Sequence, residues 1–174
     1  MNIKEVPDAS PLHPDHPEFS SLMLAGMRQA FAETPIHKLL SINLDHVEKG
    51  WAVTSMPVAP EAFNSTGNLH GGAIATLIDV AAGSAAATAG TFIPGQNHLV
   101  TADLHIRYLG RPHGDRITAD ARVLRAGRQL IVVECRVTDL EARMIASADF
   151  AGMVVPMREP LTIAGKSDNT HPDL

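Results

Sequence analysis

One carboxylate stands out in this sequence because it lies inside the longest apolar stretch. Residues 73–89 are rich in alanine, and Asp79 is the one charged side chain among them. A buried carboxylate without a partner is costly, so its presence needs a reason. A desolvated carboxylate can act as a nucleophile or as a general base. Asp79 is therefore the first candidate for chemistry.

A Gly-Gly pair directly before this stretch is the second chemical feature. Gly71 and Gly72 stand where a helix should begin, so their N–H groups and the positive end of the helix dipole suit a carbonyl oxygen that gains negative charge. Gly71 and Asp79 are eight residues apart. That is about 12 Å along a helix axis, too far for both to touch one carbonyl group. A site that uses both residues must therefore combine two chains.

Alternating apolar and polar residues predict strands on both sides of this helical segment. One strand begins at residue 40 and, after a turn at residues 48–50, a second runs over residues 51–58. Four more are expected after the helix, over residues 100–108, 116–124, 129–138 and 143–155. In the first of these four, Thr101 is expected on one face and the apolar residues on the other, namely Val100, Ala102, Leu104, Ile106 and Tyr108.

The order of these elements predicts an α+β fold. Short connections favour antiparallel neighbours, and one antiparallel sheet wrapped around the long helix accounts for all the strands. The helix is apolar nearly all round, so we expect it to be buried nearly all round. The sheet of a partner subunit is the simplest cover for its second side.

The two ends of the chain differ from the middle. Residues 1–18 contain four prolines and predict an extended arm, followed by an amphipathic helix over residues 19–33 that ends before Pro35. We therefore divide the chain into an arm and helix (1–36), the main domain (37–156) and a polar tail with little order (157–174). No apolar core of a signal peptide is present near the start, so we expect a cytoplasmic protein.

Composition excludes several classes of protein. The 174 residues carry a formal net charge of −5, and no strongly basic face suggests nucleic acid as a partner. The longest apolar stretch is too short and too polar to span a membrane. A single cysteine excludes an intramolecular disulfide, and Cys135 itself reads as a small core residue within an apolar strand. The histidines lack the spacing of a zinc site.

The motif Asn64-x5-His70-Gly71-Gly72-x6-Asp79 resembles that of the hotdog-fold acyl-CoA thioesterases, in particular the branch typified by phenylacetyl-CoA thioesterase. The strand at residues 100–108 and the Gly127-Arg128 turn also match, so that the likeness covers roughly residues 40–155. It implies a hotdog fold, to which the N-terminal helix would be an addition, with no metal and no cofactor. It also implies an acyl-CoA substrate and a homodimer with shared sites, which could pair further into a tetramer. The N-terminal helix and the long connection at residues 90–98 depart from the pattern and leave the acyl group undetermined.

The resemblance also implies roles for single residues. Asp79 would be the nucleophile or general base, Asn64 would orient the attacking water or the carboxylate, and His70 would hold the loop or contact the carbonyl region. Thr101 would lie near the carboxylate, in the same subunit as Asp79, while Gly71 with the other residues would come from the partner. Each also has a purely structural interpretation: Asn64 as a turn residue, His70 as a helix-start residue and Thr101 as an exposed strand residue.

The phosphates of CoA require cations near the mouth of the site. The candidates for CoA binding are Gly72, the Gly127-Arg128 pair and three further arginines, Arg107, Arg111 and Arg125.

Two other functions compete with thioester hydrolysis. Asp8 and His13 are spaced as in hotdog-fold enoyl-CoA hydratases, although Ser10 stands where those enzymes have asparagine and the pair lies in the proline-rich arm. The other alternative is a non-catalytic module that binds acyl-CoA. It would be stabilised by CoA without releasing a free thiol.

Overall fold

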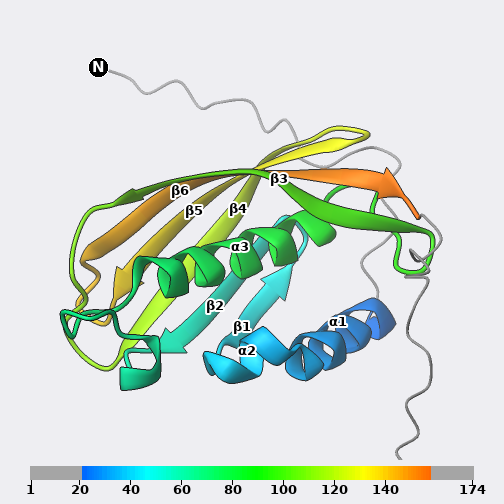
Figure 1. Cartoon of the computed structure of the whole chain (residues 1–174). Helices are drawn as coiled ribbons and strands as arrows, with labels where there is room; N and C mark the ends of the chain where they lie inside the picture. Colours follow the sequence, from blue (N-terminus) through cyan, green and yellow to red (C-terminus); the bar gives the residue numbers. More distant parts are fainter. Residues whose placement is uncertain (1–20, 158–174) are drawn as a thin grey trace, which may run out of the picture.

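The computed structural model describes residues 21–157, with side chains from Leu24 onward. A six-stranded antiparallel sheet curves around one long helix, α3 (Gly71–Ala87), in the strand order β1-β2-β4-β5-β6-β3 (Figure 1). The strands are β1 (Asn43–Glu48), β2 (Trp51–Pro57), β3 (Asn97–Tyr108), β4 (Arg116–Ala126), β5 (Leu130–Asp139) and β6 (Met144–Pro156). The predicted α+β arrangement and all six predicted strands are therefore confirmed.

Small side chains let α3 lie close to the sheet. Ala81, Ala82, Ala85 and Ala86 are completely buried on the face that meets the strands. Just beyond the helix, a Cβ atom added at Gly90 would overlap the side chain of Ile131 on β5. The alanine-rich composition thus has a steric cause, because larger side chains on this face would push the helix away from the sheet.

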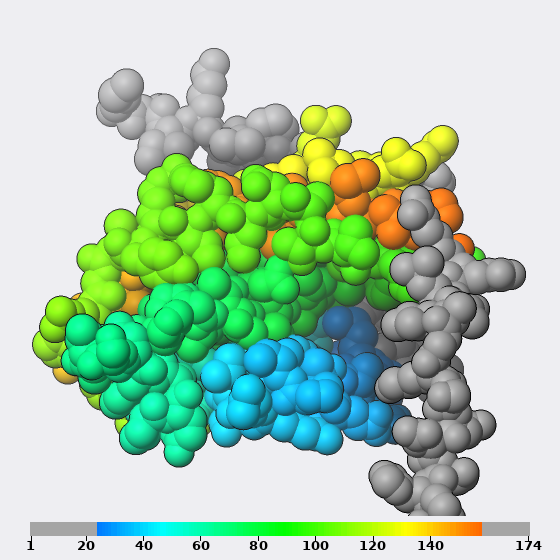
Figure 2. Space-filling model, viewed as in Figure 1, coloured from blue at the N-terminus to red at the C-terminus, as the bar shows by residue number. Residues whose placement is uncertain are grey.

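The opposite face of α3 is not buried by the sheet of its own chain, so burial nearly all round would need a further cover on this face. Asp79, Val80, Gly83, Ser84 and Ala87 are all half-buried. The space-filling view shows α3 at the surface between β3 and the N-terminal helices (Figure 2). These are α1 (Ser21–Glu33) and α2 (Pro35–Leu39), and residues of both line the groove along this face. The chain's own N-terminal helices therefore cover part of the face for which a partner subunit was expected.

Helix α2 was not predicted, and β1 begins later than expected. Pro35 occupies a first-turn position of α2, where its missing N–H is not needed. Ser41 then has a φ of 52°, which interrupts any extended conformation. The strand assignment at residues 40–42 was therefore wrong, and alternation of three apolar residues was too short a pattern to distinguish a strand from a helix end.

A β-bulge in β3 corrects the expected faces of that strand. Pairing with β6 shifts between Thr101 and Asp103, which leaves Ala102 as an extra residue. Leu99 and Thr101 therefore point to the same side as Leu104, toward α3, whereas Val100 remains 41% exposed. A strict two-residue period cannot reveal such an insertion, and the predicted separation of Thr101 from the core face was wrong for this reason.

Cys135 is completely buried on β5, as the sequence indicated. Burial, with the nearby negative charges of Asp120 and Glu134, raises the pKa of its thiol to about 12. It is a core residue with almost no thiolate at neutral pH.

A buried carboxylate holds the turn between β5 and β6. The Asp139 side chain accepts hydrogen bonds from the backbone N–H groups of His113, Glu141 and Arg143, each at 3.0 Å, and from Arg143 Nε at 3.2 Å. These donors, first of all the N–H of His113, hold the pKa of Asp139 below its ordinary value of 3.8.

The lowered pKa of Asp139 predicts a loss of stability in acid. A carboxyl whose folded-state pKa lies below its unfolded-state pKa contributes stability above the unfolded value, and that contribution disappears as pH falls through the folded value. We expect Asp139→Asn to unfold at lower denaturant concentration than the parent at pH 7, with the difference shrinking below about pH 4. Asp149→Asn, at an exposed acid, is the control. A constant difference between Asp139→Asn and the parent from pH 7 to pH 3 would show that charge is not responsible.

Candidate active site

Asp79 and Thr101 meet at the surface of α3. The Thr101 hydroxyl donates a hydrogen bond of 2.7 Å to Asp79 Oδ1. The bulge at Ala102 makes this contact possible because it turns Thr101 toward the helix. The second oxygen, Oδ2, has no hydrogen-bond partner among residues 21–157. The structure therefore brings together these two predicted residues within one chain and leaves one carboxylate oxygen available.

The two glycines at the start of α3 differ in what their N–H groups do. His70 is the N-cap residue, and its Nδ1 accepts a hydrogen bond of 2.8 Å from the Gly72 N–H. The Gly71 N–H has no partner in the described part of the chain, and at the first helical position it has none within the helix. His70 thus acts here as a helix cap. Of the two N–H groups considered for a carbonyl oxygen, only that of Gly71 has no partner among residues 21–157.

Tyr108 at the end of β3 contacts the same glycine. Its hydroxyl donates to the Gly71 carbonyl oxygen at 3.0 Å, and a Cβ added at Gly71 would lie 3.4 Å from the tyrosine Cζ. The contact fixes the first turn of α3 relative to β3. The sequence showed Tyr108 only as the last apolar-face residue of a strand. One feature of the sequence could have marked it: Tyr108 is the single tyrosine of the chain and ends the strand at residues 100–108 that matches the family.

Asn64 organises the loop that leads to α3. Its Oδ1 accepts hydrogen bonds from the N–H and the hydroxyl of Thr66 and from the N–H of Asn68. Phe63 and Leu69 pair across the loop, which closes it on itself. The side-chain oxygen of Asn64 therefore has the structural function of a turn residue, and a role toward water stays a prediction for its amide nitrogen.

A groove runs along the outer face of α3, with Asp79 and Thr101 among its lining residues. It has a volume of about 370 Å³. The remaining lining residues come mainly from α1, α2, α3, β3, β6 and the connection between α3 and β3. Most of them are apolar: Met27, Ala30, Phe31, Val80, Gly83, Ala87, Phe92, Leu99 and Phe150. Three of the five phenylalanines of the chain are among them. The site thus combines a carboxylate with an apolar groove.

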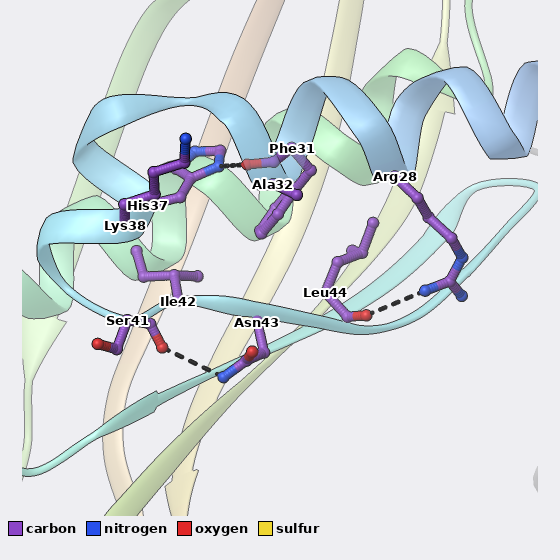
Figure 3. A pocket seen from close by; sticks show the side chains of 9 residues that line it. All are labelled: Arg28, Phe31, Ala32, His37, Lys38, Ser41, Ile42, Asn43 and Leu44. Atoms are coloured by element: carbon purple, nitrogen blue, oxygen red, sulfur yellow. Dashed lines mark hydrogen bonds between the residues drawn. The ribbon is translucent and has the colours of Figure 1, made fainter.

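A second cavity of about 410 Å³ lies between α1, α2 and the beginning of β1 (Figure 3). Arg28 and Lys38 line it, and the Arg28 guanidinium donates to the Leu44 carbonyl oxygen at 3.3 Å. Phe31 and His37 line both cavities and separate them. His37 Nδ1 is 2.9 Å from the Phe31 carbonyl oxygen, so this nitrogen carries the proton and donates. Asp79 does not line this second cavity.

The arginines predicted to bind CoA do not gather in one chain. Arg107 forms an exposed ion pair of 3.3 Å with Asp149 between β3 and β6. Arg111 follows β3, at the end of the sheet where Tyr108 meets the start of α3. Arg125 and Arg128 lie at the β4–β5 hairpin, where Thr91 donates to the Arg128 carbonyl oxygen. The hairpin is therefore tied to the segment after α3, at the opposite end of the helix from Arg111 (Figure 1).

Some predictions cannot be compared with this structure. Asp8 and His13, the residues of the hydratase alternative, lie outside the described residues, as do the arm and nearly all of the tail. Within residues 21–157, no three histidine, cysteine or acidic side chains are grouped as metal ligands. No helix in this range is long and apolar enough to cross a membrane.

Comparison with known proteins gives consistent matches. A family model described as the thioesterase superfamily matches residues 66–146, which include Gly71, Asp79 and Thr101. A putative esterase of Saccharolobus solfataricus is 34% identical over 113 residues, which cover 65% of this chain and 78% of the relative. A medium/long-chain acyl-CoA thioesterase of Escherichia coli is 31% identical over 132 residues, covering 69% of this chain and 85% of the relative.

Among solved structures, the PaaI protein from the phenylacetic acid degradation operon of E. coli matches with a TM-score of 0.67 and 21% identity. The match covers 78% of this chain and 93% of that chain. The likeness concerns the fold, and it confirms the predicted sheet wrapped around a central helix.

Proposed function

Because this chain belongs to the thioesterase superfamily, we propose that it hydrolyses acyl-CoA to a free acid and CoA, with Asp79 acting on the thioester carbon. Thioester hydrolysis is the reaction class of the family to which it belongs. An acyl-CoA substrate is supported by the Escherichia coli relative and by the apolar groove beside Asp79.

The hydrogen bond from Thr101 to Asp79 carries this proposal. A carboxylate at the edge of an apolar groove costs free energy unless water or a hydrogen-bond partner stabilises its charge. Thr101 occupies Oδ1 and fixes the orientation of the carboxylate, so Oδ2 is left for the reaction. Either Oδ2 attacks the thioester carbon, or it takes a proton from the water that attacks. In both cases the C–S bond breaks, a C–O bond forms and the leaving thiolate takes up a proton.

The Gly71 N–H is the proposed donor to the thioester carbonyl oxygen. It is unpaired in the described chain and lies at the positive end of a helix of 17 residues. As the tetrahedral intermediate forms, negative charge develops on the carbonyl oxygen, and a fixed N–H donor stabilises that charge. His70 supports this role indirectly, because it caps the neighbouring N–H and holds the first turn in place.

Two chains are needed to join these groups in one site. Gly71 and Asp79 lie on the same helix, about 12 Å apart along its axis. β3, which carries Thr101, is an edge strand of the sheet, so backbone groups on its outer side are open to a second copy. We propose a homodimer in which Asp79 and Thr101 of one subunit face Gly71 of the other, giving two equivalent sites. Such a dimer could also bring arginines from opposite ends of two sheets to one CoA.

A thiol-release assay tests the proposed function. Acetyl-, hexanoyl-, decanoyl- and hexadecanoyl-CoA are supplied with a chromogenic thiol reagent, together with phenylacetyl-CoA. The protein's own thiol does not interfere, because Cys135 is buried and its pKa is raised to about 12. We expect release of CoA from the apolar acyl groups. Stabilisation of the protein by acyl-CoA without any release of thiol would contradict the proposal and favour a binding module.

A further inference from the structure

Beyond Asp79, the polar side chains of the groove along α3 already use their donor hydrogens on partners among the described residues. The Ser84 hydroxyl donates to the Val80 carbonyl oxygen and the Thr34 hydroxyl to that of Ala30. His37 donates to the Phe31 carbonyl oxygen. An occupant of this part of the groove therefore finds no free side-chain donor and gains free energy mainly by burying apolar surface.

Gly83 lines this groove between Asp79 and Ala87. Asp79, Gly83 and Ala87 follow one another at intervals of four residues, so they form a row on one face of α3. The row extends about 12 Å from the carboxylate toward the end of the helix. Phe31 on α1 and Leu99 on β3 are among the residues that line the groove with it.

A glycine at this position has no local structural cause. Its backbone lies within α3 and does not have a positive φ, and a Cβ added there would meet no atom within 4 Å. Glycine inside a helix weakens it relative to alanine. Alanine would therefore fit and would favour the helix, so the open space above Gly83 is the feature that needs an explanation.

We propose that Gly83 determines the length of the acyl chain that the enzyme accepts. This inference rests on the proposed function. A straight acyl chain runs from the thioester at Asp79 over Gly83 toward Ala87 and Phe92, and α1 forms one side of its channel. A side chain at position 83 would close the channel roughly halfway along the row, about 6 Å from Asp79.

The expected effect depends on chain length. Burial of each methylene group raises kcat/KM by about fourfold while the channel has room. With leucine at position 83, a long acyl chain loses the burial of about three methylene groups, which lowers kcat/KM by roughly 50-fold. A chain that ends before position 83 keeps its contacts, so its kcat/KM stays within about twofold of the parent.

The experiment compares Gly83→Ala and Gly83→Leu with the parent on acetyl-, hexanoyl- and decanoyl-CoA. Gly26→Ala and Gly26→Leu are matched controls, because Gly26 is also a helical glycine with no atom within 4 Å of an added Cβ and does not line the groove. We expect a graded loss for decanoyl-CoA at position 83, alanine less than leucine, and an unchanged profile at position 26. Gly83→Ala needs no rearrangement of the fold, because an added Cβ meets no atom within 4 Å. It therefore still tests the proposal if the leucine variant does not fold.

The failure of this inference differs from the failure of the proposed function. A parent enzyme that releases no thiol from any acyl-CoA overturns the function itself. A parent that is active, with the same chain-length profile in both Gly83 variants, overturns the role of Gly83. In a third result, Gly83→Leu changes the sedimentation coefficient and lowers kcat/KM equally for all substrates. This would show that a second copy of the chain occupies the groove, and it would also overturn the inference.

Discussion

Replacing Asp79 with alanine should lower kcat for acyl-CoA by about 10³-fold and leave the fold intact. The substitution removes the group that attacks the thioester or activates water, and neither Thr101 nor Ser84 can replace a carboxylate as a base. Alanine also fits the site sterically, because the alanine-rich helix already carries such side chains above and below. The loss of one hydrogen bond from Thr101 should change the free energy of unfolding by only about 1 kcal/mol.

The measurement is steady-state thiol release, with circular dichroism and sedimentation to verify fold and assembly. Asp79→Asn is the isosteric companion, which keeps a partner for Thr101 but removes the charge, and it should be nearly as inactive. Asp45→Asn removes the same charge at an exposed position on β1 and should keep parental activity. Activity of Asp79→Ala equal to that of the parent would exclude Asp79 from the reaction.

Isotope labelling then tests for direct attack by Asp79 Oδ2. In a single turnover in ¹⁸O-water with excess enzyme, activation of water places ¹⁸O in the released acid. Direct attack by Oδ2 forms an anhydride. If water opens it at the aspartyl carbon, the first product acid carries an unlabelled oxygen from the enzyme.

Replacing Gly71 with proline should lower kcat by about 10²- to 10³-fold, because proline removes the one N–H proposed to stabilise the oxyanion. The position tolerates proline in other respects. Proline is common at the first residue of a helix, and His70, with φ −68° and ψ 134°, already has the extended conformation that a residue before proline prefers.

Gly71→Ala is the matched control for the proline variant. Alanine keeps the N–H and brings a Cβ to a distance of 3.4 Å from Tyr108, as proline would. If the N–H is what matters, alanine should retain most of the activity and proline should not. Equal losses in the two variants would instead assign the effect to the contact with Tyr108.

The Asp79→Ala and Gly71→Pro variants together test whether the site is shared between subunits. In a mixed dimer of Asp79→Ala and Gly71→Pro chains, one site has both substitutions and the other has neither. Random mixing of equal amounts makes about half of the dimers mixed, so activity should rise to about a quarter of the parental value, although each variant alone is nearly inactive. No recovery after subunit exchange, with mixed dimers verified by mass spectrometry, would place the whole site in one chain.

Local patterns in the sequence were sufficient to predict the main elements. The two-residue period identified β2, β4, β5 and β6, and the apolar, proline-free stretch after Gly71 identified α3. Asp79 stood out for a reason that needs no neighbours, since a charge in an apolar helix has a cost wherever the helix packs. The helix-start and turn interpretations of His70 and Asn64 likewise depend on nearby residues, and the structure shows the local hydrogen bonds of both side chains.

Contacts between distant residues were beyond the reach of those patterns. The bulge at Ala102 depends on how β3 pairs with β6, and it alone turns Thr101 toward Asp79. Tyr108 reaches Gly71 across 37 residues, and Phe31 on α1 lines the same groove as Phe150 on β6. None of these pairs has a signature in the local sequence, because their geometry depends on the register and curvature of the whole sheet.

The sequence by itself therefore determined the order of the elements, the carboxylate in the helix and the glycines at its start. Periodicity and desolvation cost are properties of single segments, so both can be evaluated without knowledge of the fold. Only the tertiary structure decided which N–H group is free, which hydroxyl orients Asp79 and which residues form the groove. These depend on side chains brought together from four or more elements, whose relative positions follow from the packing of the alanine face of α3 against the sheet.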